Sequence, residues 1–276
     1  MNLVELNVWL DVVFTALYIV VVLFLLFHFS LYVYTGRFRR SFIEGHWPEH
    51  DERPPATPKW LHAVHMTSMI ILGFTGMYLR FPFFVSNRVI MRDTHYVFMI
   101  IVIVVLVWRV WYAFFSKTNA DWREFSIGRK DIGSMLGVLA YYGYFSDSKP
   151  HVAKYNVMQK MAYAMFLVMM VAQALTGLFI WRYQVPILSV SLYGVTASLL
   201  GGTGVWAMRT VHYILNWLFI ILTTVHLYLA AHIDMPCTMD FFGIKPMDVH
   251  PGGHGHDDVH EEVPAQLEPQ VEPTGA

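Results

Sequence analysis

Residues 207–232 read AMRTVHYILNWLFIILTTVHLYLAAH, an almost unbroken apolar run. A helix of about 18 or more apolar residues is long enough to cross the hydrocarbon core of a bilayer. Two histidines, His212 and His226, interrupt the run fourteen positions apart. At about 100° and 1.5 Å per residue, they would lie within roughly 40° of one helix face and about 21 Å apart along it. The stretch therefore predicts a membrane-spanning helix that offers two imidazoles on one face at two depths.

The rest of the chain continues this apolar pattern. Hydrophobic residues make up 56% of the 276 residues and charged residues only 14%, which is not the balance of a soluble domain. Four further blocks meet or approach the length of a span, namely 10–34, 60–80, 94–115 and 157–181. The amino terminus lacks basic residues, and its apolar run is too long for the h-region of a signal peptide, so we expect the first block to remain as a helix. The composition predicts an all-α integral membrane bundle of five transmembrane helices.

The basic residues distinguish two sides of this bundle. Most of the 19 lysines and arginines lie in the loops after the first and third predicted helices. Because loops rich in Lys and Arg stay in the cytoplasm, we predict a multi-pass protein of the cytoplasmic membrane with its amino terminus outside and its carboxyl terminus inside. Residues 243–276 are rich in Gly, Pro, Glu and His and predict a disordered cytoplasmic tail.

Several chemistries are excluded by what the sequence lacks. An iron–sulfur cluster needs about four thiolates, and covalently attached haem needs Cys-x-x-Cys-His, whereas this chain has one cysteine, Cys237. No Gly-rich dinucleotide or phosphate fingerprint is present, which argues against flavin or nicotinamide chemistry. The net charge of -1 does not favour nucleic acid.

The membrane histidines can be paired by depth. The helix at 60–80 begins on the cytoplasmic side with His62 and His65, and the helix at 94–115 begins on the opposite side with His95. Depth therefore pairs His95 with His212, and either His62 or His65 with His226. Haem iron takes two axial imidazoles from facing helices, so these pairs predict two haem sites. The alternative is that these are buried histidines satisfied by hydrogen bonds. That explanation suits a single histidine better than four histidines matched in depth and face.

An internal repeat supports the pairing. Thr75-Gly76 is followed by Arg92-x-x-His95, and Thr176-Gly177 is followed by Arg209-x-x-His212, which predicts two degenerate parallel copies. A rough two-fold axis along the membrane normal would bring His95 and His212 face to face. Arg109 stands fourteen residues after His95, where His226 stands after His212. Its charge predicts a haem propionate as partner, and a snorkelling arginine near the helix end is the alternative.

These motifs resemble the di-haem cytochrome b subunits of respiratory nickel–iron hydrogenases and formate dehydrogenases, within the wider cytochrome b561-like membrane family. The features that carry the resemblance are Trp60-Leu61-His62 with Thr75-Gly76, Arg92-x-x-His95 with Arg109-Val-Trp-Tyr-Ala-Phe, Lys154-Tyr155-Asn156-x-x-Gln159-Lys160, and His212-x4-Trp217-x8-His226.

The resemblance implies a ligand set and a quinone site. It selects His62 over His65, so that His62 and His226 would hold the cytoplasmic-side b-type haem, and His95 and His212 the external one. It also implies that a quinone, menaquinone or ubiquinone, binds near Asn156 and Gln159. From the residues alone, Asn156 could equally cap the helix that follows it.

The resemblance also implies partners. Electrons would enter from an iron–sulfur subunit, attached to a hydrogenase- or formate-dehydrogenase-like catalytic subunit, and leave to quinone. Two alternatives are a stand-alone b561-type electron carrier and a haem-free membrane anchor or transporter.

The family usually begins at the second predicted helix. The expected organisation is therefore an extra transmembrane helix at 1–35, a cytoplasmic loop at 36–58, the di-haem domain at 59–242 and the tail at 243–276. His28, on the extra helix, is expected to have a structural role.

Overall fold

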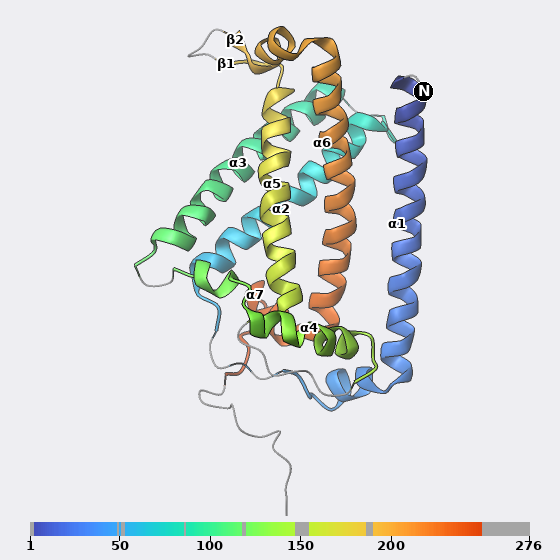
Figure 1. The fold of residues 1–276 in the computed structure, drawn as a ribbon, viewed down its shortest axis with the longest axis vertical. Coiled ribbons are helices and arrows are strands. Elements are labelled where there is room, and N and C mark those ends of the chain that lie inside the picture. The colour runs from blue at the N-terminus through green and yellow to red at the C-terminus, as the bar shows by residue number, and fades with distance from the viewer. Residues whose placement is uncertain are drawn as a thin grey trace, which may run out of the picture.

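The computed structural model describes residues 3–48, 50, 53–85, 87–117, 120–146, 155–185 and 190–249 (Figure 1). Most of the predicted tail, residues 250–276, lies outside these described residues, so its disorder stays a prediction. Five long helices dominate the fold: α1 (Leu3–Tyr34), α2 (Ala56–Arg80), α3 (Arg88–Phe115), α5 (Val157–Phe179) and α6 (Leu192–Ile233). The shorter elements are η1 (Arg39–Ile43), η2 (Trp122–Phe125), α4 (Arg129–Tyr142), α7 (Met235–Phe241) and a hairpin of β1 (Gln184–Val185) with β2 (Val190–Ser191).

The helices form two antiparallel hairpins and an added helix. α2 packs along α3, and α5 packs along α6, as the sequence repeat predicts. α1 packs on α6 and runs beside it, while α2 and α3 lie obliquely to α1, α5 and α6 (Figure 1). We name the two ends of the bundle after the elements found there: the hairpin end carries β1 and β2, and the α7 end carries α4 and α7.

Four of the five long helices are long and apolar enough to cross a membrane: α1, α3, α5 and α6. The sequence predicts five spans, and α2 is the helix that does not qualify. Its 25 residues are long enough, at about 1.5 Å each, to cross the hydrocarbon core. However, they include Lys59, two histidines and several hydroxyl side chains, which lower its hydropathy.

α6 begins well before the predicted helix at 207–232. It starts at Leu192 and bends at Gly201, whose φ of 67° lies in the left-handed region that glycine adopts without a steric penalty. Polar and glycine residues in 192–204 lower the mean hydropathy of this first segment, so the sequence did not predict it as part of the helix. The bend marks the point where the chain turns into the long straight part of α6 that carries both histidines.

α1 is fixed to the other helices by polar contacts at both ends. Near the hairpin end, Asp11 pairs with Arg80 of α2 at 2.8 Å and accepts a 2.6 Å hydrogen bond from Tyr213 of α6. Near the α7 end, His28 donates through Nε2 to the carbonyl of Tyr142 at 2.8 Å. Its Nδ1 therefore accepts from the hydroxyl of Tyr228, 2.7 Å away. The expected structural role of His28 matches this geometry.

α4 lies across the α7 end and packs against α5 (Figure 1). The buried ammonium of Lys160, in the first turn of α5, contacts Asp131 of α4 at 2.9 Å. The backbone N–H of Gly128 and the ammonium of Lys160 hold the pKa of Asp131 below its ordinary value. The ion pair between Asp131 and Lys160 thus fixes α4 to α5.

Candidate functional site

The first histidine pair lies toward the hairpin end. His95 of α3 and His212 of α6 face each other with ring centroids 6.4 Å apart. Residues 117 positions apart in sequence are thus brought together by the packing of the two helical hairpins. This is the pair that the depth of the histidines and the internal repeat predict.

Two threonines orient this pair in the same way. The hydroxyl of Thr75 lies 2.9 Å from Nδ1 of His95, and the hydroxyl of Thr176 lies 2.9 Å from Nδ1 of His212. Each hydroxyl also donates to the carbonyl four residues earlier in its helix, so it accepts from the histidine. Both imidazoles therefore carry their proton on Nδ1 and keep Nε2 as a lone-pair donor. A metal-binding histidine is commonly fixed in this way.

Two glycines make room for the same rings. A Cβ atom on Gly76 would lie 3.4 Å from Cε1 of His95, and one on Gly177 would lie 3.2 Å from Cε1 of His212. Each histidine ring therefore lies against the backbone of a glycine, where a larger residue would displace it. A Cβ atom on Gly73, one turn before Gly76, would have nothing within 4 Å.

The second pair lies toward the α7 end. His62 of α2 and His226 of α6 also have ring centroids 6.4 Å apart. Aromatic rings flank this pair: Phe241 of α7 packs edge-on against His62, and Phe166 of α5 packs against His226. His212 and His226 thus both face the α2–α3 hairpin, which agrees with their predicted common face.

His65 occupies a different position. It follows His62 by one helical turn, and within the described residues its buried Nε2 atom has no hydrogen-bond partner. Buried polar atoms without a partner are uncommon and mark a group that another molecule can satisfy. The structure brings His62, not His65, into ring contact with His226.

The two pairs fit a b-type haem by spacing. A metal–imidazole bond is about 2 Å long and the ring centroid lies about 1 Å behind the bound nitrogen, so two axial imidazoles on one iron have centroids roughly 6 Å apart. Both observed separations are 6.4 Å. The amide nitrogen of Gln173 lies 3.3 Å from Nε2 of His212. The side-chain oxygen of the same glutamine is buried without a partner among the described residues. The donor set and its surroundings suit an iron porphyrin.

Arg109 finds a counter-charge within the chain. Its guanidinium donates to both carboxylate oxygens of Asp121, at 3.2 and 2.7 Å, and lies over the ring of Phe125. Asp121 follows α3 and its partnership with Arg109 was not predicted. Propionate binding by Arg109 stays a prediction, and the ion pair with Asp121 already neutralises the arginine.

Asn156 and Gln159 form a capping box at the start of α5. The side chain of Asn156 accepts from the backbone N–H of Gln159 at 3.0 Å, and Gln159 accepts from the backbone N–H of Asn156 at 2.9 Å. Asn156 also donates to the hydroxyl of Tyr142 at 3.0 Å and is 1% exposed. The capping alternative is therefore confirmed, whereas a quinone contact stays a prediction. Burial raises the pKa of Tyr142, which keeps its phenol protonated.

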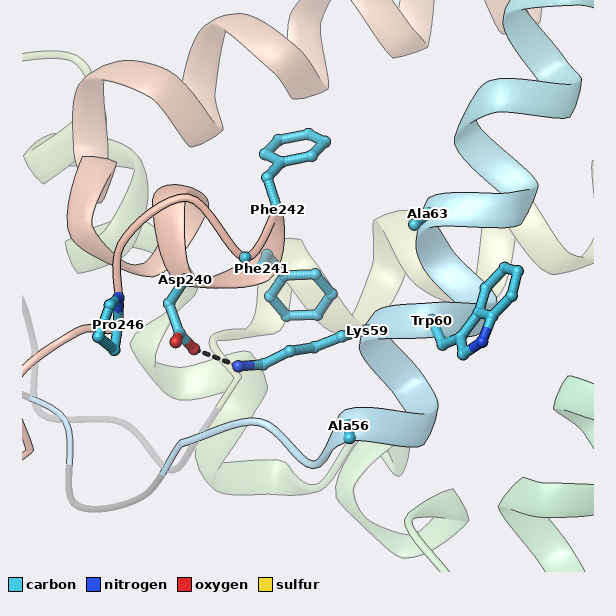
Figure 2. A pocket seen from close by; sticks show the side chains of 9 residues that line it. Ala56, Lys59, Trp60, Ala63, Asp240, Phe241, Phe242 and Pro246 are labelled. Atoms are coloured by element: carbon cyan, nitrogen blue, oxygen red, sulfur yellow. Dashed lines mark hydrogen bonds and ion pairs between the residues drawn. The ribbon is translucent and has the colours of Figure 1, made fainter.

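A cavity of about 480 Å³ opens between the start of α2 and α7 (Figure 2). Trp60 and Phe242 line it, as does Phe241, whose ring packs against His62. On its wall, Lys59 of α2 and the buried Asp240 of α7 form an ion pair at 2.5 Å. The sequence did not single out this pair, because the residues lie far apart in the chain and neither lies in a recognisable motif.

The fold and the two histidine pairs define a class of protein: a multi-pass helical membrane cytochrome. A family model described as prokaryotic cytochrome b561 matches residues 53–234, and the chain belongs to that family. The match includes α2 to α6 with all four paired histidines, and it leaves out α1. The family consists of transmembrane b-type electron carriers, so the chain binds b-type haem. Neither the curated proteins nor the solved structures gave a significant match.

Proposed function

We propose that the chain is a two-haem cytochrome b that carries electrons across the membrane between an iron–sulfur partner and quinone. The observation that supports it is that α6 contributes one histidine to each of two facing pairs with equal centroid separations. When bound, a haem iron alternates between ferric and ferrous states and so carries one electron.

Each histidine pair would hold one of the two haems. His95 and His212 would ligate one iron, and His62 and His226 the other. The hydroxyls of Thr75 and Thr176 keep the first pair in the neutral tautomer that ligates through Nε2. His95 and His212 are half-buried, whereas the rings of His62 and His226 are exposed beside Phe241 and Phe166.

The proposal includes five spans. α2 packs along α3, and it would cross the membrane with its polar residues turned toward the bundle and the cofactor. The distribution of basic residues supports a cytoplasmic α7 end and an external hairpin end. The haem domain would then be 59–242, with 1–35 as an additional span and 36–58 as a cytoplasmic loop.

Quinone would exchange electrons near the α7 end, beside His226. Asn156 and Gln159 would act there through the capping box, which fixes the start of α5. The side-chain amide of Asn156 also donates a hydrogen bond to the hydroxyl of Tyr142 and so positions the phenol. Tyr142 is a protonated phenol and can donate to a quinone carbonyl. The quinone would be menaquinone or ubiquinone.

The partners would bind at the hairpin end. An iron–sulfur subunit with a catalytic subunit of hydrogenase or formate dehydrogenase type would supply the electrons there. A second candidate is a stand-alone carrier of the b561 type, which is favoured by the description of the matched family as prokaryotic cytochrome b561. Isolation of the intact complex separates them, because only the first co-purifies with iron–sulfur subunits.

The proposal is tested by counting haem in the purified chain. We expect a reduced-minus-oxidised spectrum with b-type absorbance and two haems per chain. One haem per chain would contradict the two-site proposal, and no b-type absorbance would favour the haem-free anchor.

A further inference from the structure

We propose that His50, Asp234 and Cys237 form a binding site for a divalent transition metal of the zinc class. The three residues come from separate parts of the chain. His50 lies in the connection between η1 and α2, Asp234 lies between α6 and α7, and Cys237 lies in α7. The site shares no residue with the histidine pairs that would hold haem.

The three donor atoms converge. One ligand atom from each residue lies within 4.8 Å of the other two. Nε2 of His50 lies 2.6 Å from one carboxylate oxygen of Asp234. The other carboxylate oxygen accepts from the backbone N–H of Cys237 at 3.1 Å, which holds the thiol on the same side. In a tetrahedral zinc site the ligand atoms lie about 3.5 Å apart, so small side-chain rotations would close this set around an ion.

The donor types suit zinc better than a hard cation. Imidazole nitrogen, thiolate sulfur and carboxylate oxygen are the three ligand classes that bind zinc, and a water would complete four-coordination. Calcium or magnesium would require mainly oxygen ligands. The imidazole and carboxylate side chains are 30% and 21% exposed, so an ion from the aqueous phase can reach them. The competing explanation is a His–Asp ion pair that fixes the loop without any metal.

A second contact near His50 involves Arg53, just before α2. The guanidinium of Arg53 donates to the carbonyl of Met247 at 2.9 Å, and Met247 is buried. Arg53, three residues after His50 in the sequence, is therefore held against the chain that follows α7. A preformed arrangement lowers the ordering cost of metal binding.

A metal here would set the position of α7. The other end of this short helix carries Asp240, which pairs with Lys59 (Figure 2), and Phe241, which packs against His62. Binding displaces the thiol proton of Cys237 to solvent and links α7 to the loop before α2. The site would thus stabilise the contact between α7 and the second histidine pair.

Metal binding is tested on the full-length chain in which the tail histidines are replaced, H250Q/H254Q/H256Q/H260Q, to remove competing imidazoles. Calorimetric titration with Zn²⁺ and metal analysis after dialysis should give one zinc per chain. C237S should weaken binding by at least tenfold, and H50Q and D234N should weaken it as well. H46Q is the matched control, because His46 is an exposed histidine of the same loop. It should bind like the parent.

A second measurement needs no substitution at the site. Zinc should slow alkylation of Cys237 by a maleimide in the folded parent chain. An unchanged alkylation rate with zinc, or a C237S variant that binds zinc with the parent's affinity, would overturn the proposal. Both readouts are independent of haem content.

Discussion

The two histidine pairs have equal centroid separations but different surroundings. At the hairpin end, threonine hydroxyls and glycine backbones fix His95 and His212 in one orientation. At the α7 end, Phe241 and Phe166 flank His62 and His226, and the contact of Phe241 comes from a short helix beyond the bundle. The first pair is therefore built into the repeated helices, whereas the second depends in part on how α7 packs. We expect the first pair to tolerate little change and the second to respond to the α7 contacts.

The largest effect is expected from removing a ligand at the α7 end. His62→Ala should lower the haem content from two per chain to one, because a single axial imidazole holds the porphyrin poorly. His65→Ala is the matched control, one helical turn away, and should keep both haems. Pyridine haemochrome analysis of the purified variants measures the content. Loss of a haem in His65→Ala alone would reverse the assignment.

A smaller effect should follow from filling the space at Gly177. A valine there would press its side chain against His212, since even a Cβ atom would lie 3.2 Å from the ring. We expect several-fold lower occupancy of the hairpin-end haem and no change at the α7 end. Gly133→Val is the control, because Gly133 lies in α4, which carries no paired histidine, and a Cβ atom there would have nothing within 4 Å. Equal occupancy in both variants would show that the ring does not need the glycine.

Removing a threonine hydroxyl should have a more modest effect. Thr176→Val takes away the acceptor for Nδ1 of His212 and should weaken haem binding at that pair by roughly tenfold, as with other partners of metal-binding histidines. It should also shift the midpoint potential of one haem only, which a redox titration measures. Thr224→Val, whose hydroxyl bonds to the carbonyl of Ile220, should leave both potentials unchanged. A matching shift in both variants would indicate a general effect on the helices.

The smallest effect concerns the capping box of α5. Asn156→Ala should destabilise the protein by about 1 kcal/mol, the ordinary cost of losing an N-cap. Asn156→Ser keeps a capping hydroxyl but shortens the side chain away from Tyr142, so it should restore most of the stability. Thermal unfolding measures the first effect, and haem reoxidation by a quinone analogue measures any role of the Tyr142 contact. If Asn156→Ser reoxidises like the parent, Asn156 acts only as a cap.

The sequence predicted the parts of this account that depend on periodicity. Helical spacing placed His212 and His226 on one face, and the Thr-Gly repeat pointed to the pairing of His95 with His212. Periodicity could not reveal that each threonine bonds the histidine beside it, since that needs the position of a neighbouring helix. Nor could it reveal the partners of Arg109 and Lys59, because Asp121 lies in a loop and Asp240 on a short helix. The early start of α6 was missed because glycines lower the hydropathy of 192–204.

Double substitutions distinguish the proposed pairing of histidines across helices from any other pairing. Removing both members of one pair, H95A/H212A, should leave one haem per chain with unchanged axial ligation at the other site. Removing one member of each pair, H62A/H212A, should leave no stably bound haem. Haem contents of one and zero would support the account. Equal contents in the two double variants would contradict it.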